Sequence, residues 1–377
     1  MIRVLVIGSG QRVREAALPA LLSRPEAFAL AGIRSRKAKT IEARVPGDGG
    51  ALEPRSLDVL DFDAEGGLAG ALAHADLVYV CVSKGAVPGV LAKLADAIRG
   101  TGHPHDLLID TPVLLFKHLA ARRHFGAFAR VWVAEDMWTL PWVETIDRAR
   151  EELSLGEPRR LVLDRSAYAY HGLALAKTLL ASWRLVRARR RSTGVVPDDQ
   201  PKAGEPAFER ELTFADGRAC HVIEPRDYSL GRFRLELASG AVIADRPGGD
   251  AHVVEPVVDE ARDGLRWTGF RVGAVETHLA PHEVELLGTL EPPAPGHDDS
   301  VIARMDALKR VGFARLFDRI AAGEGAYPLE EGLDDMWVDY ALEKLGRWRA
   351  TPLTSVRSST ARGLFGGLTA LAGKLKG

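Results

Sequence analysis

The chain has 377 residues, of which 46% are hydrophobic and 27% are charged, so it is long enough for two globular domains. Its formal net charge of −1 provides no bulk attraction to nucleic acid or to an anionic membrane. We expect a cytoplasmic protein, because no apolar run is long enough to span a bilayer or to serve as a signal peptide. Cys81 and Cys220 have no metal-ligand spacing and are compatible with a reducing cytoplasm.

The start of the chain carries the clearest motif. The apolar run Met1–Ile7 predicts a strand, Gly8-Ser9-Gly10 predicts a tight turn, and Arg14–Leu22 predicts a helix. Glycine in such a turn lets the backbone approach a pyrophosphate, and the amide groups at the start of the helix then point at the phosphates. Val13 stands where a third glycine is usual, so the motif alone is weak. We expect phosphate contacts from Gly8, Gly10, Gln11 and Arg12; the alternative is a strand–turn–helix without a ligand.

The end of the second apolar run indicates which dinucleotide is bound. A site for NAD commonly has an acid there that holds the ribose 2′-hydroxyl. This chain has no acid from Leu30 to Thr40 and offers Arg34, Ser35 and Arg36 instead, followed by Lys37 and Lys39. Guanidinium and hydroxyl donors suit a 2′-phosphate. We therefore favour NADP(H), with NAD(H) as the second choice; the alternative is a solvated basic loop.

The rest of the first half alternates between strand and helix patterns. Strands are predicted at Leu57–Phe62, Asp76–Val82, Asp106–Asp110 and Arg130–Ala134, and helices at Leu68–His74 and Val87–Ile98. This alternation predicts an α/β domain with a doubly wound parallel sheet. Ligands of such sheets bind at the carboxyl ends of the strands, where Gly8, Ser83 and Asp110-Thr111-Pro112 fall.

The second half has consecutive strand patterns, which predict a largely antiparallel sheet. Strands are expected at Arg159–Arg165, Arg210–Phe214, Arg218–Ile223, Phe233–Leu237 and Ala241–Ala244, and helices at Leu173–Val186, Asp299–Ala322 and Leu333–Trp348. The five arginines between Arg184 and Arg191 are interpreted as a solvated helix end; a phosphate-binding patch is the alternative. The predicted boundaries are 1–125 for the nucleotide domain, 126–348 for an α+β domain and 349–377 for a tail.

The tail contains apolar residues at helical spacing between Leu364 and Leu375, interrupted by glycines. A short amphipathic helix packed on its own domain, or a frayed end, is the expected structure. A dimer contact or a weak surface anchor is the alternative.

The order of these motifs resembles the glucose–fructose oxidoreductase / inositol dehydrogenase / MocA (Gfo/Idh/MocA) family. The resemblance covers Val4 to about Gly346 and includes Gly8-Ser9-Gly10 with Leu18-Pro19, Glu135 followed by Leu140-Pro141, and the turn Leu155 to Arg160. It implies an N-terminal Rossmann domain that binds NAD(P), followed by a domain with an open-faced sheet, and an oxidoreductase that acts on a polar cyclic substrate between the two.

Two departures from the family pattern affect the expected catalytic residues. Most members have Glu-Lys-Pro after the fifth strand, with a lysine used in proton transfer, but this chain has Asp110-Thr111-Pro112. The family's Asp four residues before a His is Ala167 here, so only His171 remains. His171 is the first candidate for proton transfer because imidazole changes charge near neutral pH.

Other donors are also candidates. Tyr168 and Tyr170 flank His171, and Lys84 follows the fourth strand. Each has a structural alternative: His171 caps or orients a helix, one tyrosine belongs to the core, and Lys84 is a solvated loop residue.

We therefore expect an NADP(H)-dependent oxidoreductase that acts on a carbonyl of a keto-sugar or related cyclic compound, without a metal. Two alternatives stay open: an NADP-binding sensor or assembly protein that has lost catalysis, and an imine reductase. The expected partners are the small-molecule substrate and further copies of the chain in a dimer or tetramer, with no nucleic acid and no stable membrane insertion.

Overall fold

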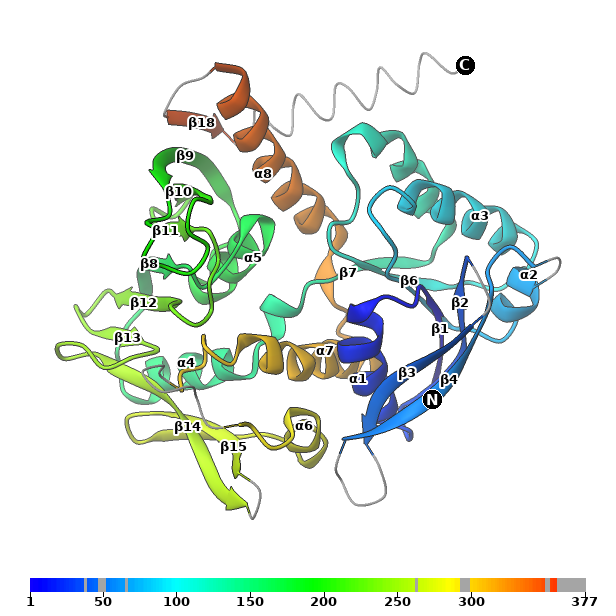
Figure 1. The fold of residues 1–377 in the computed structure, drawn as a ribbon, viewed down its shortest axis with the longest axis horizontal. Helices are drawn as coiled ribbons and strands as arrows, with labels where there is room; N and C mark the ends of the chain where they lie inside the picture. The colour runs from blue at the N-terminus through cyan, green and yellow to red at the C-terminus, as the bar shows by residue number, and fades with distance from the viewer. Residues whose placement is uncertain are drawn as a thin grey trace.

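The fold, seen in a computed structural model, consists of two β-sheets with helices packed on them (Figure 1). The structure describes residues 1–36, 39–46, 52–64, 67–261, 264–291, 299–349 and 353–357. Within these residues, no helix is long and apolar enough to cross a membrane. The expected pairing of a doubly wound sheet with a second, largely antiparallel sheet is confirmed.

The first sheet has the strand order β17-β7-β6-β5-β1-β2-β4-β3. Its strands are β1 (Ile2–Ile7), β2 (Phe28–Ser35), β3 (Lys39–Pro46), β4 (Leu52–Asp61), β5 (Leu77–Val80), β6 (Asp106–Asp110), β7 (Arg130–Ala134) and β17 (Tyr327–Pro328). Pairing is parallel from β7 to β4, while β3 and β17 are antiparallel edge strands. The chain order reverses between β1 and β5, which is where a doubly wound sheet binds its ligand.

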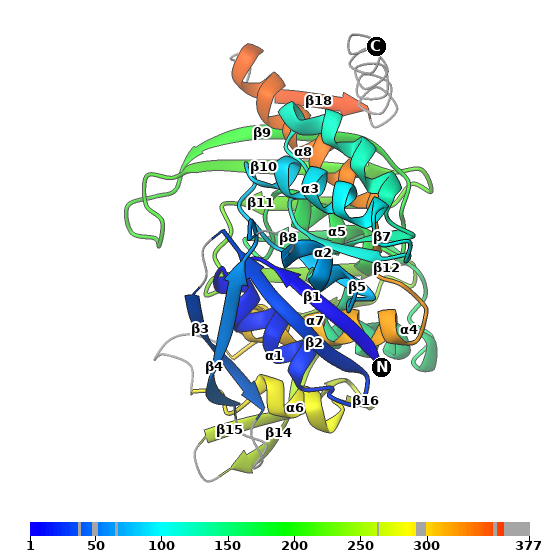
Figure 2. The same cartoon turned by 90° about the vertical axis from the view of Figure 1, so that its right-hand side faces the viewer.

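The central strands β1, β5 and β6 are apolar on both faces because helices cover both. One face contributes Val4, Val6 and Tyr79 to a core with the helical turn Val13–Ala17, with α1 (Leu18–Leu22) and with α7 (Met305–Ala321). The other face packs against α2 (Gly67–Leu72), α3 (Val87–Arg99) and the 3-10 helical segment Phe116–Ala127. Figure 2 shows α7 behind β1 and β2, so a late part of the chain completes the first domain's core.

The second sheet has the strand order β16-β15-β14-β13-β12-β8-β11-β10-β9-β18. Its strands are β8 (Pro158–Asp164), β9 (Leu185–Val195), β10 (Pro206–Phe214), β11 (Ala219–Glu224), β12 (Arg232–Leu237), β13 (Val242–Ala244), β14 (His252–Ala261), β15 (Gly264–Val272), β16 (Val275–His278) and β18 (Leu353–Arg357). Only the pairs β8–β11 and β13–β14 are parallel.

Helices cover one face of this sheet. They are α4 (Pro141–Glu152), α5 (Ala169–Leu179), α6 (Pro281–Leu287) and α8 (Leu329–Arg349). Burial alternates along β12, where Phe233 and Leu235 are buried and Arg232 and Arg234 are exposed, as expected for a sheet with one face toward the core. The exposed face carries charged cross-strand pairs such as Arg189 with Glu211, whose side-chain atoms approach to 3.4 Å.

Some predictions of elements were wrong. The segment Arg184–Arg191 is not a helix end, because β9 begins at Leu185 and pairs with β10 and β18. Its arginines are accommodated in a strand because Arg191 pairs with Glu209 and Arg190 lies 3.5 Å over the ring of Phe208.

The limits of other elements also differ from the predictions. The strand expected at Leu57–Phe62 is the longer β4, and its partner β3 begins at Lys39, inside the expected basic loop. β7 belongs to the first sheet, although it lies beyond residue 125. Leu353–Arg357 forms β18, while the helix predicted in the tail lies outside the described residues.

Candidate functional site

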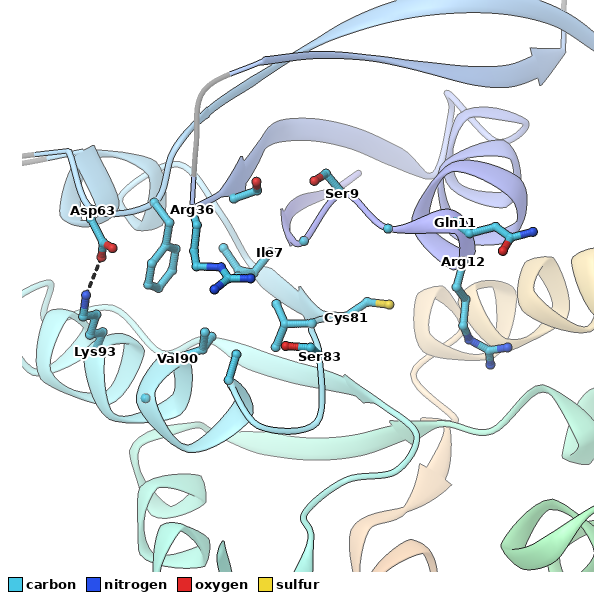
Figure 3. A pocket seen from close by; sticks show the side chains of 17 residues that line it. Ile7, Ser9, Gln11, Arg12, Arg36, Asp63, Cys81, Ser83, Val90 and Lys93 are labelled. Atoms are coloured by element: carbon cyan, nitrogen blue, oxygen red, sulfur yellow. Dashed lines mark hydrogen bonds and ion pairs between the residues drawn. The ribbon is translucent and has the colours of Figure 1, made fainter.

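A cavity of about 500 Å³ lies at the carboxyl ends of β1, β2 and β5, over the glycine turn (Figure 3). The predicted residues that line it are Gly8, Gly10, Gln11, Arg12, Ser35, Arg36 and Ser83. Phe62, Asp63 and Lys93 line it as well, and the sequence patterns did not indicate them. The cavity therefore brings together most of the residues expected to hold a dinucleotide.

The two glycines of the turn have different roles. Gly8 has a φ of +126°, and a Cβ there would lie 1.9 Å from the carbonyl oxygen of Cys81, so the fold itself requires glycine. A Cβ on Gly10 would meet no atom within 4 Å. Gly10 therefore leaves open space beside the start of the helix, which is the space that a pyrophosphate needs, and the turn fits a dinucleotide.

Arg12 lines the cavity and connects the glycine turn with the ends of two neighbouring strands. Its Nε donates to Asp110 at 2.7 Å, its Nη1 to Asp136 at 3.2 Å, and its Nη2 to the carbonyl oxygen of Ala134 at 3.2 Å. Burial alone would lower the pKa of this guanidinium, but the two carboxylates outweigh burial and hold that pKa above its ordinary range. Arg12 thus links the glycine turn to Asp110 and Asp136 through charged hydrogen bonds, a role that was not predicted beside the expected phosphate contact.

The basic residues at the end of β2 separate into two groups. Ser35 and Arg36 line the cavity, but Arg34 does not. Arg34 is buried, and its Nη1 donates to the carbonyl oxygen of Asp61 at 2.9 Å. The structure therefore gives no support to a 2′-phosphate contact from Arg34.

An ion pair lines the same part of the cavity as Arg36. Lys93 on α3 pairs with Asp63, and its Nζ lies 5.8 Å from the centre of the Phe62 ring (Figure 3). These side chains follow β4 or lie on α3, so the sequence near β2 could not reveal them.

The segment Asp110-Thr111-Pro112 lies at the end of β6 but does not line the cavity. Asp110 accepts hydrogen bonds from Arg12 and, at 3.1 Å, from the thiol of Cys81. Burial raises the pKa of that thiol, so Cys81 stays protonated and serves as a donor. Lys84 is exposed and does not line the cavity, so the structure does not bring this candidate to the other site residues.

His171 lies on α5 beside a carboxylate from the segment that follows β7 of the first sheet. Its Nδ1 is 2.8 Å from Oε2 of Glu135, which follows β7 and is buried. Because an ionised carboxylate only accepts hydrogen bonds, Nδ1 carries the hydrogen, and Nε2 is left to exchange a proton with a ligand. The missing acid at Ala167 is thus replaced from a distant part of the chain.

The two flanking tyrosines lie near this imidazole at different depths. The ring of Tyr170 is centred 4.4 Å from that of His171, and the ring of Tyr168 is centred 6.4 Å away. Burial raises the pKa of Tyr170, whereas Tyr168 is 45% exposed. The structure therefore brings all three predicted residues together, with Tyr168 on the solvent side.

A buried network fixes the start of α5. The backbone N–H of Ala169 donates to Glu224 at 2.7 Å, Glu224 pairs with Arg210 at 3.0 Å, and Arg210 pairs with Asp339 on α8. Charged groups that are buried and mutually paired hold their neighbours in one geometry. The network therefore sets the position of His171 relative to Glu135.

Glu135, Asp136 and His171 form a group whose potential ligand atoms lie within 4.8 Å of one another. Both oxygens of Glu135 contact His171, and Asp136 pairs with Arg12. Burial would raise the pKa of Asp136, but Arg12, Lys309 and His171 outweigh burial and lower it. Since cations already balance these acids, we interpret the group as a hydrogen-bonded cluster rather than a metal centre.

Comparisons with known proteins define the class of fold. No protein-family model and no curated protein matches the chain by sequence. A probable dehydrogenase from Thermotoga maritima matches with a TM-score of 0.59 and 14% identity, over 96% of this chain and 100% of that one. A myo-inositol dehydrogenase from Corynebacterium glutamicum matches with a TM-score of 0.58 and 14% identity, over 94% and 98%.

A further similar structure is an oxidoreductase from Agrobacterium radiobacter in complex with NAD+, L-tartaric acid and magnesium. It has a TM-score of 0.56 and 13% identity, and covers 95% of this chain and 99% of the other. These similarities extend over nearly the whole length of each chain. The chain therefore has the two-domain fold of these dehydrogenases, which confirms the expected resemblance at the level of the fold.

Proposed function

We propose that this protein is an NADP(H)-dependent oxidoreductase that acts on a carbonyl group of a polar cyclic substrate. The observation that carries the proposal is the bridge through Arg12, which lines the dinucleotide cavity and contacts Asp136, a member of the His171 cluster. The inositol dehydrogenase among the similar structures supports a cyclic polyol or keto-sugar as the substrate class.

The chain's own residues supply binding and proton transfer. Gly8 and Gly10 would hold the pyrophosphate, and a bound nicotinamide supplies the hydride that the protein cannot. His171 would donate a proton from Nε2 to the carbonyl oxygen, while Glu135 holds Nδ1 and stabilises the charged imidazole. Thr111 cannot replace the family lysine in this step, because a hydroxyl is a far weaker acid than imidazolium.

The choice of NADP(H) over NAD(H) is tested at Arg36. Losing a charge-assisted contact to the 2′-phosphate costs about 1.5–3 kcal/mol, so Arg36→Ala is expected to weaken NADPH binding by roughly 10- to 100-fold. NADH binding should change by less than about twofold, because NADH lacks that phosphate. Titration calorimetry with both nucleotides measures this, and Arg99→Ala on α3, which does not line the cavity, is the control. Tighter binding of NADH than NADPH by the wild type would contradict the preference.

Because the family lysine is absent, the competing proposal is that the protein is a sensor or an assembly protein. A panel of keto-sugars, inositols and cyclic imines, followed by NADPH fluorescence, separates the possibilities. We expect oxidation of NADPH with a carbonyl compound. Stoichiometric binding of NADPH without oxidation of any member would favour the sensor, and turnover restricted to imines would favour an imine reductase.

We also propose a homo-oligomer, a dimer or tetramer, whose contact includes exposed apolar side chains of β9. Val186 and Val195 on β9 are 38% and 61% exposed, which is high for branched apolar side chains. Val195→Asp is expected to shift the mass measured by light scattering at micromolar concentration toward the monomer. A wild type that is monomeric under these conditions would contradict the proposal.

A further inference from the structure

A guanidinium without an acidic partner lies near Tyr168, a neighbour of His171. Arg226 belongs to the loop between β11 and β12, and its guanidinium carbon lies 6.0 Å from the ring centre of Tyr168 and 4.8 Å from that of Tyr228. No hydrogen bond or ion pair joins this guanidinium to any residue in the described part of the chain. Because aromatic faces hold a guanidinium in place without using its N–H groups, its donors are free for a ligand.

Tyr228 also contacts a second cation, Lys309. Lys309 on α7 donates from Nζ to the Tyr228 hydroxyl oxygen at 2.7 Å, so the hydroxyl hydrogen is left to donate elsewhere. Burial would lower the pKa of Lys309, but Tyr228 and Asp136 outweigh burial and raise it. Lys309 therefore stays charged.

The cations in this region differ in whether an acidic side chain is paired with them. Lys309 is 3.4 Å from Asp306 and acts on Asp136, while Arg12 pairs with Asp110 and Asp136. Among the described residues around His171, the Arg226 guanidinium is not paired with any of these acids. A guanidinium with free N–H groups holds a planar carboxylate through two parallel hydrogen bonds, so Arg226 fits a ligand that carries a carboxylate.

We propose that Arg226 and the Tyr228 hydroxyl bind a carboxylate of the substrate, which is therefore a sugar acid. This inference rests on the proposed oxidoreductase function and adds the substrate class. The ring centre of Tyr168 lies 6.0 Å from the guanidinium carbon of Arg226 and 6.4 Å from the ring centre of His171, so Tyr168 neighbours both groups. A sugar ring packed on the exposed face of Tyr168 would place its carboxylate at Arg226 and its reacting carbon at His171.

The test compares D-glucuronate with D-glucose, which share a ring and differ in the carboxylate. With NADP+ as oxidant, we expect wild-type kcat/KM to be at least about tenfold higher for glucuronate. Arg226→Gln should lower that ratio by roughly 10- to 100-fold. Arg234→Gln, on the exposed face of β12, should leave the ratio unchanged. A wild type that prefers glucose would overturn the sugar-acid inference while leaving the oxidoreductase proposal intact.

A binding measurement keeps the two proposals separate. Calorimetry of glucuronate on the NADP+-loaded protein is expected to show binding to the wild type and at least about tenfold weaker binding to Arg226→Gln. Equal binding to both proteins would overturn the role of Arg226. Binding that depends on Arg226, combined with no oxidation of either sugar and no reduction of any compound in the carbonyl panel, would instead contradict the proposed enzymatic function.

Discussion

Replacing His171 with alanine is expected to lower kcat by about 10²–10⁴-fold, because a positioned acid–base group contributes that much to proton transfer. The affinity for NADPH should stay within about twofold, since His171 does not line the dinucleotide cavity. Steady-state rates with the best substrate of the carbonyl panel, together with NADPH titration, measure both quantities. Undiminished turnover in His171→Ala would remove the assignment of His171 as the proton donor.

Glu135→Gln tests the partner of His171 while conserving its shape. An amide cannot stabilise a charged imidazole as a carboxylate does, so kcat should fall by about 10–100-fold, less than in His171→Ala. A kcat for Glu135→Gln equal to that of the wild type would contradict this role of Glu135.

Gly8→Ala is expected to destabilise the protein and to abolish dinucleotide binding. A Cβ would lie 1.9 Å from the carbonyl oxygen of Cys81, and alanine is strained at a φ of +126°. Strain and overpacking of this kind together cost about 2–5 kcal/mol. Urea denaturation measures the free energy of unfolding, and titration with NADPH measures binding.

Gly10→Ala is the matched control, because a Cβ there meets no protein atom within 4 Å. Its free energy of unfolding should stay within about 1 kcal/mol of the wild type, while NADPH affinity falls at least about tenfold. A Gly10→Ala variant that binds NADPH normally would contradict the placement of the pyrophosphate at this turn. A Gly8→Ala variant as stable as the wild type would contradict the backbone contact.

Local sequence patterns predicted the strands and turns whose structure depends on neighbouring residues. The run Met1–Ile7 with Gly8 and Gly10 indicated β1 and its turn, because a buried parallel strand is continuously apolar and a tight turn needs glycine. The second sheet followed from consecutive strand patterns separated by turn residues such as Asp216-Gly217. The arginine-rich β9 was missed because its charges are balanced only across the strands, by Glu209 and Glu211 on β10.

The candidate site was predicted only in part because its pairs are distant in sequence. His171 was identified from the family pattern, but Glu135 lies 36 residues away, in the segment that follows β7. Likewise, Lys93 meets Asp63 only because α3 and the end of β4 converge on the cavity. A single sequence contains no signal that links such residues, since each of them is locally an ordinary charged side chain.

The packing of α7 has a consequence for how the protein is made. The rings of Phe313 and Phe317 lie 5.9 and 6.4 Å from that of Tyr79, so residues synthesised near the end of the chain close the core beneath the dinucleotide cavity. A fragment that ends at residue 125 would expose this face and is expected to aggregate. We therefore expect the first sheet to complete its core only after Met305–Ala321 has left the ribosome, so that the two parts of the chain fold together.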